Sequence, residues 1–449
     1  MSKKKVVIIG GGLAGLASAV FLKEADKNNL LDITLYESSP KLGGRAYSFI
    51  DKKTGEFFDN GQHILAGWYK NTFDYLKLIG TYDKISFQKS LEVNFIDADS
   101  RVLKLKCPNL PAPLDLIAGL RRFDGFTKED RKSLRALLKL VTLKPSGKNA
   151  LELLRSFNQT DNLIKYFWEP FIYAVFNTKA ENVGDIAFIG IMKKGFLKPG
   201  NSRLAIPSTN LNELFIDNAK KYFDQNGVTY NCGNKIAGIN LSNNTVTHIS
   251  DSKGNIIEAD YFISAVPFFR VNELFPPESN IAFGGRLKPS SITSIHIFTE
   301  TAIPETLLAD NSFGMTGLIG RTVQWIFKRN SKHLSLVISG SDYLEDGQGE
   351  TLTDIEAEAI YNIAYDDLCK SIDGFDKLGI AGYKVIKEKR ATFIPDNDSE
   401  NYRLPMETEY ENLFLAGDWT DTGYPATIEG AITSGRKCAD KVIKIISGS

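Results

Sequence analysis

The pattern of apolar and polar positions predicts alternating strands and helices at the start of the chain. Val6 to Ile9 is a β-branched apolar run of the kind that forms a strand buried on both faces. It leads through a glycine-rich turn into Leu16 to Ala25, whose Ala- and Leu-rich sequence predicts a helix. A second apolar strand is predicted at Ile33 to Tyr36. This strand–helix–strand order is typical of a parallel sheet.

The last part of the chain shows a similar strand and helix. Asn412 to Ala416 is a short apolar run that predicts a strand, and Gly417 and Asp418 end it. Thr427 to Ile446 predicts a helix, because apolar residues recur at helical spacing: Ile428, Ile432, Ala439, Val442 and Ile446. We therefore expect the two ends of the chain to build one domain together.

Composition limits the classes of function. With 449 residues the chain is long enough for two domains. Its 54 Lys and Arg balance 54 Asp and Glu, so we expect no nucleic-acid partner. The cysteines are scattered (Cys107, Cys232, Cys369 and Cys438) and predict neither a disulfide framework nor a metal site. No uncharged run is long enough to span a membrane, and we expect a cytoplasmic protein.

The turn after the first strand carries candidate chemistry. It reads Gly10-Gly11-Gly12-Leu13-Ala14-Gly15 and contains a G-x-G-x-x-G motif. In a dinucleotide-binding turn, Gly10 makes the tight turn, Gly12 lets the backbone approach a pyrophosphate, and Gly15 lets helix and strand pack closely. The helix start, with Leu13 and Ala14, then offers unpaired N–H groups to the phosphates. The motif alone is weak evidence, because glycine-rich turns are common.

The second strand supplies independent support for a nucleotide. It ends in Glu37, 22 residues after Gly15. A carboxylate at this place can accept hydrogen bonds from both hydroxyls of a ribose, and it would repel a 2′-phosphate. The two features together predict a site for an adenosine diphosphate moiety.

The residues that follow Glu37 distinguish FAD from NAD. Ser38 to Arg45 resembles the second phosphate motif of the flavin amine oxidase and phytoene desaturase superfamily. The resemblance implies that Gly43 and Gly44 bring backbone to the flavin side of the pyrophosphate, with Arg45 as its cation. The implied cofactor is FAD, with Ser38 among the residues that bind it.

The C-terminal motif extends this resemblance to the flavin ring. In the superfamily the last helix points its N-terminus at the pyrimidine ring and stabilises negative charge there. The resemblance implies that Asp418, after Gly417, bonds the ribityl chain, and that Thr427 and Ile428, after Ala426, offer backbone N–H groups. A helix cap is the alternative role for Asp418. The resemblance also places the backbone of Ile236 near adenine.

These observations predict an α/β fold: a Rossmann-like FAD-binding domain of the amine oxidase and phytoene desaturase type, with an inserted α+β substrate domain. Residues 1–85, 204–269 and 387–449 are expected to form the FAD-binding domain, and residues 86–203 and 270–386 the substrate-binding domain. In the superfamily a meander precedes a final strand of the cofactor sheet. Short strands are predicted here at Val228 to Asn231, Ala237 to Leu241, Thr245 to Ile249, Ile256 to Ala259 and Tyr261 to Val266.

The first insertion is locally basic and contains two predicted amphipathic helices. Pro113 to Phe123 places apolar residues beside Arg121 and Arg122, and Leu134 to Leu143 has a similar pattern. A basic amphipathic helix is typical of a membrane-surface element. An ordinary solvated helix face gives the same pattern. Peripheral contact with the inner membrane is therefore one of two interpretations.

Four further segments are informative together: Asp59 to His63 with Gly67, Trp68 and Tyr69; Phe167 to Pro170 with Asn177 and Thr178; Glu388 to Phe393; and Gly417 to Ala431. They resemble the bacterial hydroxysqualene dehydroxylase family, and the similarity runs from end to end. The last two are the most specific. Tyr424 stands where many relatives have a smaller apolar residue, and Phe171 to Tyr173 where relatives are richer in Leu and Cys. These departures concern the shape of the pocket and leave the implied reaction in place.

The resemblance implies reductive removal of the hydroxyl group of hydroxysqualene, a C30 isoprenoid, to give squalene for hopanoids or sterols. It also implies a functional link to squalene-synthase-like enzymes. The chemistry needs an acid near the hydroxyl, an apolar tunnel and little water. We predict that His63 and Gln62, after Gly61, make this polar contact beside the flavin, with a structural role for His63 as the alternative. Residues predicted to line the tunnel, or else to pack in the core, are Trp68, Trp168, Phe171, Tyr173 and Phe176.

Three other activities stay open at this point. A carotenoid-type desaturase would transfer hydride in the opposite direction on the same fold. A true amine oxidase is disfavoured, because a position that supplies an aromatic ring to its substrate cage corresponds here to Thr427. A non-catalytic carrier of prenylated proteins would share the fold without flavin, and Arg45 with the complete C-terminal motif argues against it.

Overall fold

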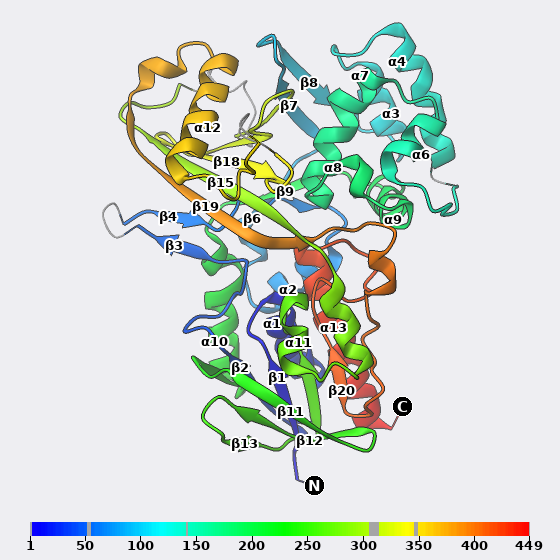
Figure 1. The fold of residues 1–449 in the computed structure, drawn as a ribbon, viewed down its shortest axis with the longest axis vertical. Helices are drawn as coiled ribbons and strands as arrows, with labels where there is room; N and C mark the ends of the chain where they lie inside the picture. The colour runs from blue at the N-terminus through cyan, green and yellow to red at the C-terminus, as the bar shows by residue number, and fades with distance from the viewer. Residues whose placement is uncertain (1, 52–54, 141, 305–313, 345–348, 449) are drawn as a thin grey trace.

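The computed structural model describes residues 2–51, 55–140, 142–304, 314–344 and 349–448, arranged as a lower and an upper half (Figure 1). The lower half is built on a five-stranded parallel sheet in the order β10-β2-β1-β14-β20. Its strands are β1 (Lys4–Ile9), β2 (Leu31–Glu37), β10 (Thr229–Cys232), β14 (Tyr261–Ser264) and β20 (Leu413–Leu415). All five come from the segments that the sequence assigns to the FAD-binding domain.

Alternate residues of β1 enter two different cores, as the predicted doubly buried strand requires. Val6 and Ile8 pack with α1 (Leu13–Ala25), α13 (Ile428–Ser447), α2 (Lys70–Leu78) and α10 (Asp217–Asn226) on one face. The helices α1 and α13 cross closely, because a Cβ at Gly435 would lie 2.4 Å from the Ala14 carbonyl oxygen. The predicted first and last helices are thus confirmed as neighbours on the sheet.

The other face of the sheet carries the meander and α11 (Val271–Leu274), with Val7 and Ile9 in their shared core. The meander is antiparallel and consists of β11 (Ile236–Ser242), β12 (Thr245–Asp251) and β13 (Ile256–Ile257). The predicted strand at Val228 to Asn231 was wrongly grouped with it. That segment forms β10, which follows α10 and pairs in parallel with β2, as a strand does after a helical crossover.

The upper half is built on a seven-stranded sheet in the order β19-β15-β18-β17-β16-β7-β8. One face packs on α12 (Ala357–Ser371) through residues such as Ile295 and Leu336. Its strands are β19 (Ile380–Phe393), β15 (Pro289–Thr299), β18 (His333–Ser339), β17 (Trp325–Asn330), β16 (Met315–Leu318), β7 (Glu92–Ile96) and β8 (Val102–Lys106). The long strand β19 runs from the upper half down to the lower half, so the predicted domain boundary at 386/387 falls inside a strand (Figure 1).

Short helices cover one side of the upper half (Figure 1). They are α3 (Leu114–Arg121), α4 (Lys128–Ser133), α5 (Leu137–Leu140), α6 (Ala150–Ser156), α7 (Asp161–Leu163), α8 (Glu169–Phe176) and α9 (Asp185–Phe196). In α3 the apolar face is buried through Leu116 and Leu120, while Arg121 is exposed. The predicted helix at Leu134 to Leu143 is broken, because Leu134–Ala136 forms a 3₁₀ turn, and residue 141 lies outside the described residues.

Small strands join the two halves. They are the hairpin β3 (Ser48–Ile50) and β4 (Phe57–Asp59), and the set β5 (Leu65–Ala66), β9 (Leu204–Pro207) and β6 (Ile85–Phe87). In the described part of the chain, no helix combines the length and apolar character needed to cross a membrane.

Candidate active site

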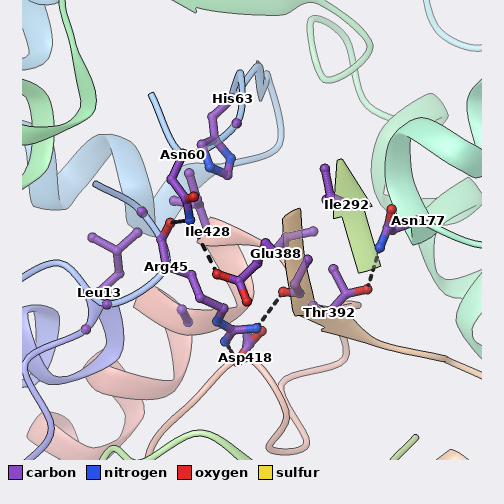
Figure 2. Close-up of a pocket in the computed structure, with 18 of the residues that line it drawn as sticks. Leu13, Arg45, Asn60, His63, Asn177, Ile292, Glu388, Thr392, Asp418 and Ile428 are labelled. Carbon is purple, nitrogen blue, oxygen red and sulfur yellow. Dashed lines mark hydrogen bonds and ion pairs between the residues drawn. The ribbon is translucent and has the colours of Figure 1, made fainter. Parts of the chain in front are cut away.

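A cavity of about 820 Å³ extends from the start of α1 to the upper sheet. Its lower end is lined by backbone at glycines of the predicted motifs: Gly10, Gly12, Gly43, Gly44 and Gly417. Its upper end is lined by apolar and aromatic side chains. Figure 2 shows the region between the two ends, with Arg45, Asn60, His63, Glu388 and Asp418 around it.

The start of α1 is open to the cavity. Gly12 precedes the helix with extended backbone, and no side chain caps the helix there. A Cβ added at Gly12 would meet only the Cα of Gly44, at 3.9 Å. Gly15 does not line the cavity; a Cβ there would lie 1.9 Å from the Gly10 carbonyl oxygen. Uncapped N–H groups beside a side-chain-free surface fit a pyrophosphate.

Glu37 lies beside this turn and lines the cavity. One carboxylate oxygen accepts from the Gly11 N–H at 2.6 Å, and the other accepts from the Ser39 N–H at 2.7 Å and the Ser38 hydroxyl at 3.2 Å. Ile236 lines the same cavity. An acidic group next to an apolar wall fits a ribose and its adenine.

Arg45 and Asp418 form an ion pair at 2.6 Å between the two motifs (Figure 2). Arg45 also donates to the carbonyl oxygen of Ala391 in β19 at 2.6 Å. Asp418 therefore pairs with a cation, while Thr427 caps α13 by accepting from the Gly430 N–H at 3.1 Å. The alternative prediction, that Asp418 caps a helix, is therefore wrong.

The N-terminus of α13 faces the cavity through Ala426, Thr427 and Ile428. The positive end of this 20-residue helix favours negative charge at that place. Directly behind it, the buried Glu429 accepts hydrogen bonds from the backbone N–H groups of Asn71 at 3.1 Å and Thr72 at 2.9 Å, at the start of α2. Burial raises the pKa of Glu429. Sequence analysis did not predict this second role of the C-terminal motif.

The loop after β4 also lines the cavity. Gly61 has a φ of +122°, and Gly61, Gln62 and His63 all line the cavity. Asn60 ties the loop down by donating to the Arg45 carbonyl oxygen at 3.0 Å and to Glu388 at 3.5 Å. Burial lowers the pKa of His63, so the ring is neutral at pH 7.

The upper end of the cavity is lined by residues of the upper sheet and of helices α8 and α9. Of the aromatic residues predicted to line it, Trp68, Phe171 and Tyr173 do so. Trp168 and Phe176 do not: both are almost fully buried in the core, where the Trp168 indole N–H donates to Gln159. Trp68 is stacked on Tyr424 with ring centres 5.4 Å apart.

Most of the upper wall was missed by sequence analysis. Residues from six strands and one flanking position share this surface: Leu91, Val93, Phe95, Leu105, Ile292, Met315, Trp325, Phe327 and Val337. The alternation Val93, Asn94, Phe95 was a usable signal for one apolar face. This alternation does not indicate which face of the sheet lines a cavity.

The lower end therefore fits FAD. An uncapped helix start, a carboxylate for the ribose, an Arg–Asp pair and a second helix N-terminus line one side of the same cavity. Bound there, FAD would present its ring between the lower glycine-lined end and the upper apolar end.

Comparison with known proteins agrees with this geometry. The model of the flavin containing amine oxidoreductase family matches residues 13–443. The chain is 30% identical to hydroxysqualene dehydroxylase of Zymomonas mobilis, covering 96% of this chain and 97% of the relative. It is 28% identical to hydroxysqualene dehydroxylase of Rhodopseudomonas palustris, covering 98% of each. It is 23% identical to a 15-cis-phytoene desaturase of Narcissus pseudonarcissus, covering 98% of this chain and 79% of the relative.

Solved structures show the same fold. Cyclohexylamine oxidase from Brevibacterium oxydans superposes with a TM-score of 0.71 over 99% of this chain and 100% of that chain, at 14% identity. At that identity the likeness concerns architecture alone. The motifs, the cavity and the family match over 13–443 together show that this chain belongs to the flavin containing amine oxidoreductase family.

Proposed function

We propose that this chain is an FAD-dependent oxidoreductase that converts hydroxysqualene to squalene by reductive dehydroxylation. The observation that carries the proposal is the continuity of one cavity, from the glycine-lined surface at Gly12 and Gly44 to the apolar wall at Phe95 and Phe327. A long hydrocarbon chain and a dinucleotide can share such a cavity. The similarity to two hydroxysqualene dehydroxylases over nearly the full chain supports the choice of substrate.

Each part of the cavity has a task in this reaction. When bound in its reduced form, FAD supplies the hydride that replaces the hydroxyl group. The apolar wall excludes water from the reacting carbon. Gln62 and His63 line the cavity, and we assign them the hydrogen bonds to the hydroxyl group. The carbon–oxygen bond breaks, and the oxygen takes up one proton and leaves as water. Because the pKa of His63 is lowered, we assign it a hydrogen-bonding contact in preference to the role of proton donor.

The test is an anaerobic incubation of the purified protein with hydroxysqualene and reduced FAD, with products identified by mass spectrometry. We expect squalene, and none from a protein loaded with oxidised FAD. Absence of squalene with reduced FAD would contradict the proposal. A parallel incubation uses phytoene and oxidised FAD. It tests desaturation as the second candidate activity, which the similarity to a phytoene desaturase favours.

We also propose that α3 and the residues that flank it touch a membrane surface. Leu110 and Leu114 are 46% and 53% exposed, and Arg121 and Arg122 are exposed on the same helix or at its end. Exposed apolar residues beside basic ones suit an anionic surface. Replacing both leucines by Asp should reduce co-flotation with anionic lipid vesicles, whereas Ile256→Asp, 65% exposed in the lower half, should not. Equal flotation of all variants would contradict this. The link to a squalene-synthase-like enzyme stays a prediction.

A further inference from the structure

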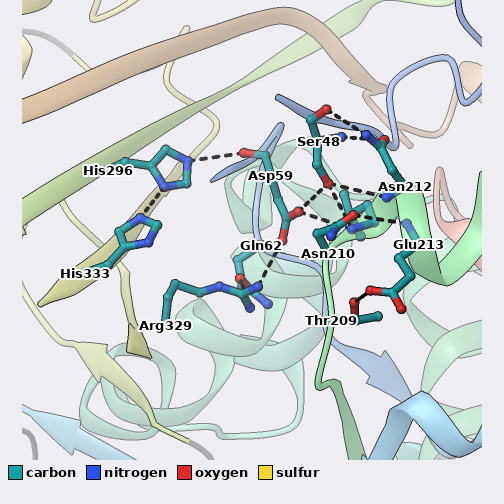
Figure 3. Close-up of polar contacts among 11 residues, drawn as sticks. Ser48, Asp59, Gln62, Thr209, Asn210, Asn212, Glu213, His296, Arg329 and His333 are labelled. Carbon is teal, nitrogen blue, oxygen red and sulfur yellow. Dashed lines mark hydrogen bonds and ion pairs between the residues drawn. The ribbon is translucent and has the colours of Figure 1, made fainter. Parts of the chain in front are cut away.

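A cluster of polar residues, three of them buried and two half-buried, includes the loop after β4 (Figure 3). It consists of Asp59, Gln62, His296, Arg329 and His333. The guanidinium group of Arg329 donates to Gln62 Oε1 at 2.8 Å and forms an ion pair with Asp59 Oδ2 at 3.4 Å. Gln62 lines the cavity, but Arg329 does not. Arg329 can therefore act on a bound ligand only through Gln62.

The contact with Arg329 fixes which way the Gln62 amide faces. A guanidinium group has only donors, so it must be met by the amide oxygen and never by the amide nitrogen. Gln62 Nε2 is consequently turned away from Arg329. Among the described residues, Nε2 has no acceptor from the protein. A donor group on the cavity wall is thus held ready for an oxygen atom of a ligand.

Arg329 is held in place by Asp59, whose carboxylate has further hydrogen bonds. The carboxylate of Asp59, with its side chain 5% exposed, also accepts from the Ser48 hydroxyl at 2.6 Å and the Leu211 N–H at 3.2 Å. These contacts leave the second carboxylate oxygen directed at Arg329. The position of the guanidinium is therefore fixed by strand β4 as well as by its own strand β17.

Two neutral histidines fix the backbone of Asp59. His296 Nε2 lies 3.2 Å from the Asp59 carbonyl oxygen, which can only accept, so Nε2 carries the hydrogen. His296 Nδ1 must then accept from His333 Nε2 at 2.9 Å. Burial lowers the pKa of His296 to about 4 and that of His333 to about 3, in agreement with two neutral rings. The two histidines thus hold the Asp59 backbone by hydrogen bonds, the Asp59 carboxylate holds Arg329 by an ion pair, and Arg329 donates a hydrogen bond to Gln62.

We infer that Arg329 is a positioning residue that orients Gln62, so that Gln62 Nε2 donates a hydrogen bond to the hydroxyl oxygen of the isoprenoid alcohol. The inference rests on the proposed function for the identity of the alcohol. It adds a specificity determinant: the site distinguishes an isoprenoid alcohol from the corresponding hydrocarbon by a donor oriented from outside the cavity. A site built to hydrogen-bond a hydroxyl group discriminates against the analogue that lacks it, because its donor is then left unpaired.

The test measures binding, which does not depend on turnover. FAD-loaded protein is titrated with hydroxysqualene and with squalene, followed by flavin fluorescence, and the ratio of the two dissociation constants is compared. We expect wild-type protein to prefer the alcohol by about 10-fold, as for one net hydrogen bond. Gln62→Leu and Arg329→Met should both remove this preference while leaving squalene binding unchanged.

Two further variants separate positioning from a general structural role. In the double variant of Gln62→Leu and Arg329→Met the two effects should not add, because Arg329 acts through Gln62. Lys384→Met is the matched control: it removes a cation whose Nζ lies 4.8 Å from the Phe58 ring, next to Asp59, without touching Gln62. It should keep the full preference. Arg329→Lys keeps a charged group with N–H donors, so it should give an intermediate preference. This variant replaces Arg329→Met in the test if Arg329→Met does not fold.

An unchanged ratio in folded, FAD-loaded Arg329→Met or Arg329→Lys would overturn the inference, as would additive effects in the double variant. A wild-type preference that depends on Gln62 and Arg329 supports it even where no squalene forms in the activity assay. Failure of the proposed function and failure of this inference are therefore distinguishable.

Discussion

The two ends of the cavity are built in different ways. The lower end consists of backbone and short motifs, each continuous in the sequence, such as Gly10 to Gly15 and Gly43 to Arg45. The upper end consists of side chains from separate strands, such as Val93, Trp325 and Val337. A backbone surface tolerates few substitutions at its glycines, whereas a wall of side chains can change one residue at a time. The shape of the lower end is therefore set by short continuous stretches of sequence. The shape of the upper end is set by the register of strands that are far apart in the sequence.

The largest effect is expected from filling the backbone surface. Gly12→Val would place a side chain where only the Cα of Gly44 now lies at 3.9 Å, in the space assigned to the pyrophosphate. The apoprotein should fold, and its dissociation constant for FAD should rise by at least about 100-fold. Flavin absorbance after reconstitution measures this. Gly190→Ala, at a helix glycine with no neighbour within 4 Å, is the control. Normal FAD content in Gly12→Val would break the assignment of the lower end.

The next effect concerns the upper end alone. Val93→Trp would fill part of the apolar wall, and kcat/KM for hydroxysqualene should fall about 10- to 100-fold, with FAD content unchanged. Thr316→Val, on a strand paired with β7, removes a buried hydroxyl group whose oxygen has no hydrogen-bond partner among the described residues. It should leave kcat/KM and stability undiminished. Loss of FAD from Val93→Trp would show that the two ends are not separable.

A third prediction tests the support behind the lower end. Glu429→Gln replaces one of the two acceptor oxygens at the start of α2 by an NH₂ group that faces backbone N–H donors. The free energy of unfolding should fall by about 1–3 kcal/mol, as expected for an unsatisfied buried donor. Urea unfolding of the apoprotein measures it. Unchanged stability would mean that the contact between α13 and α2 contributes little to fixing the N-terminus of α13.

A fourth prediction concerns the polar cluster of Asp59, Gln62, His296, Arg329 and His333. His296 and His333 have pKa values of about 4 and about 3 in the folded protein, below the ordinary value of 6.5. The unfolded chain therefore binds more protons below pH 6.5, and stability should decrease as pH falls from about 6.5 toward 4, by about 1 kcal/mol per pH unit for each histidine. His333→Gln, which keeps a donor for His296, should show a shallower loss in urea unfolding at pH 6.5 and 5. Identical losses would contradict two neutral histidines.

Sequence analysis could predict those elements and motifs whose formation depends on residues that are neighbours in the chain. The first strand, the first and last helices and the glycine turns were recognisable because their signals lie within one segment. The apolar wall was not, since Trp168 and Phe176 look like tunnel residues in sequence but are turned into the core. Arg329 was missed because its partners, Asp59 and Gln62, lie 270 and 267 residues away. Such contacts depend on the register of β17 against the sheet, which no local pattern specifies.

The central claim is that one cavity brings a bound flavin and an isoprenoid alcohol together. The most direct measurement is a single turnover of FAD-loaded, chemically reduced protein mixed with hydroxysqualene without oxygen, following the return of oxidised flavin absorbance and the squalene formed. The account predicts one squalene for each flavin reoxidised, and no signal from Gly12→Val. Flavin that stays reduced in the presence of bound hydroxysqualene would contradict it.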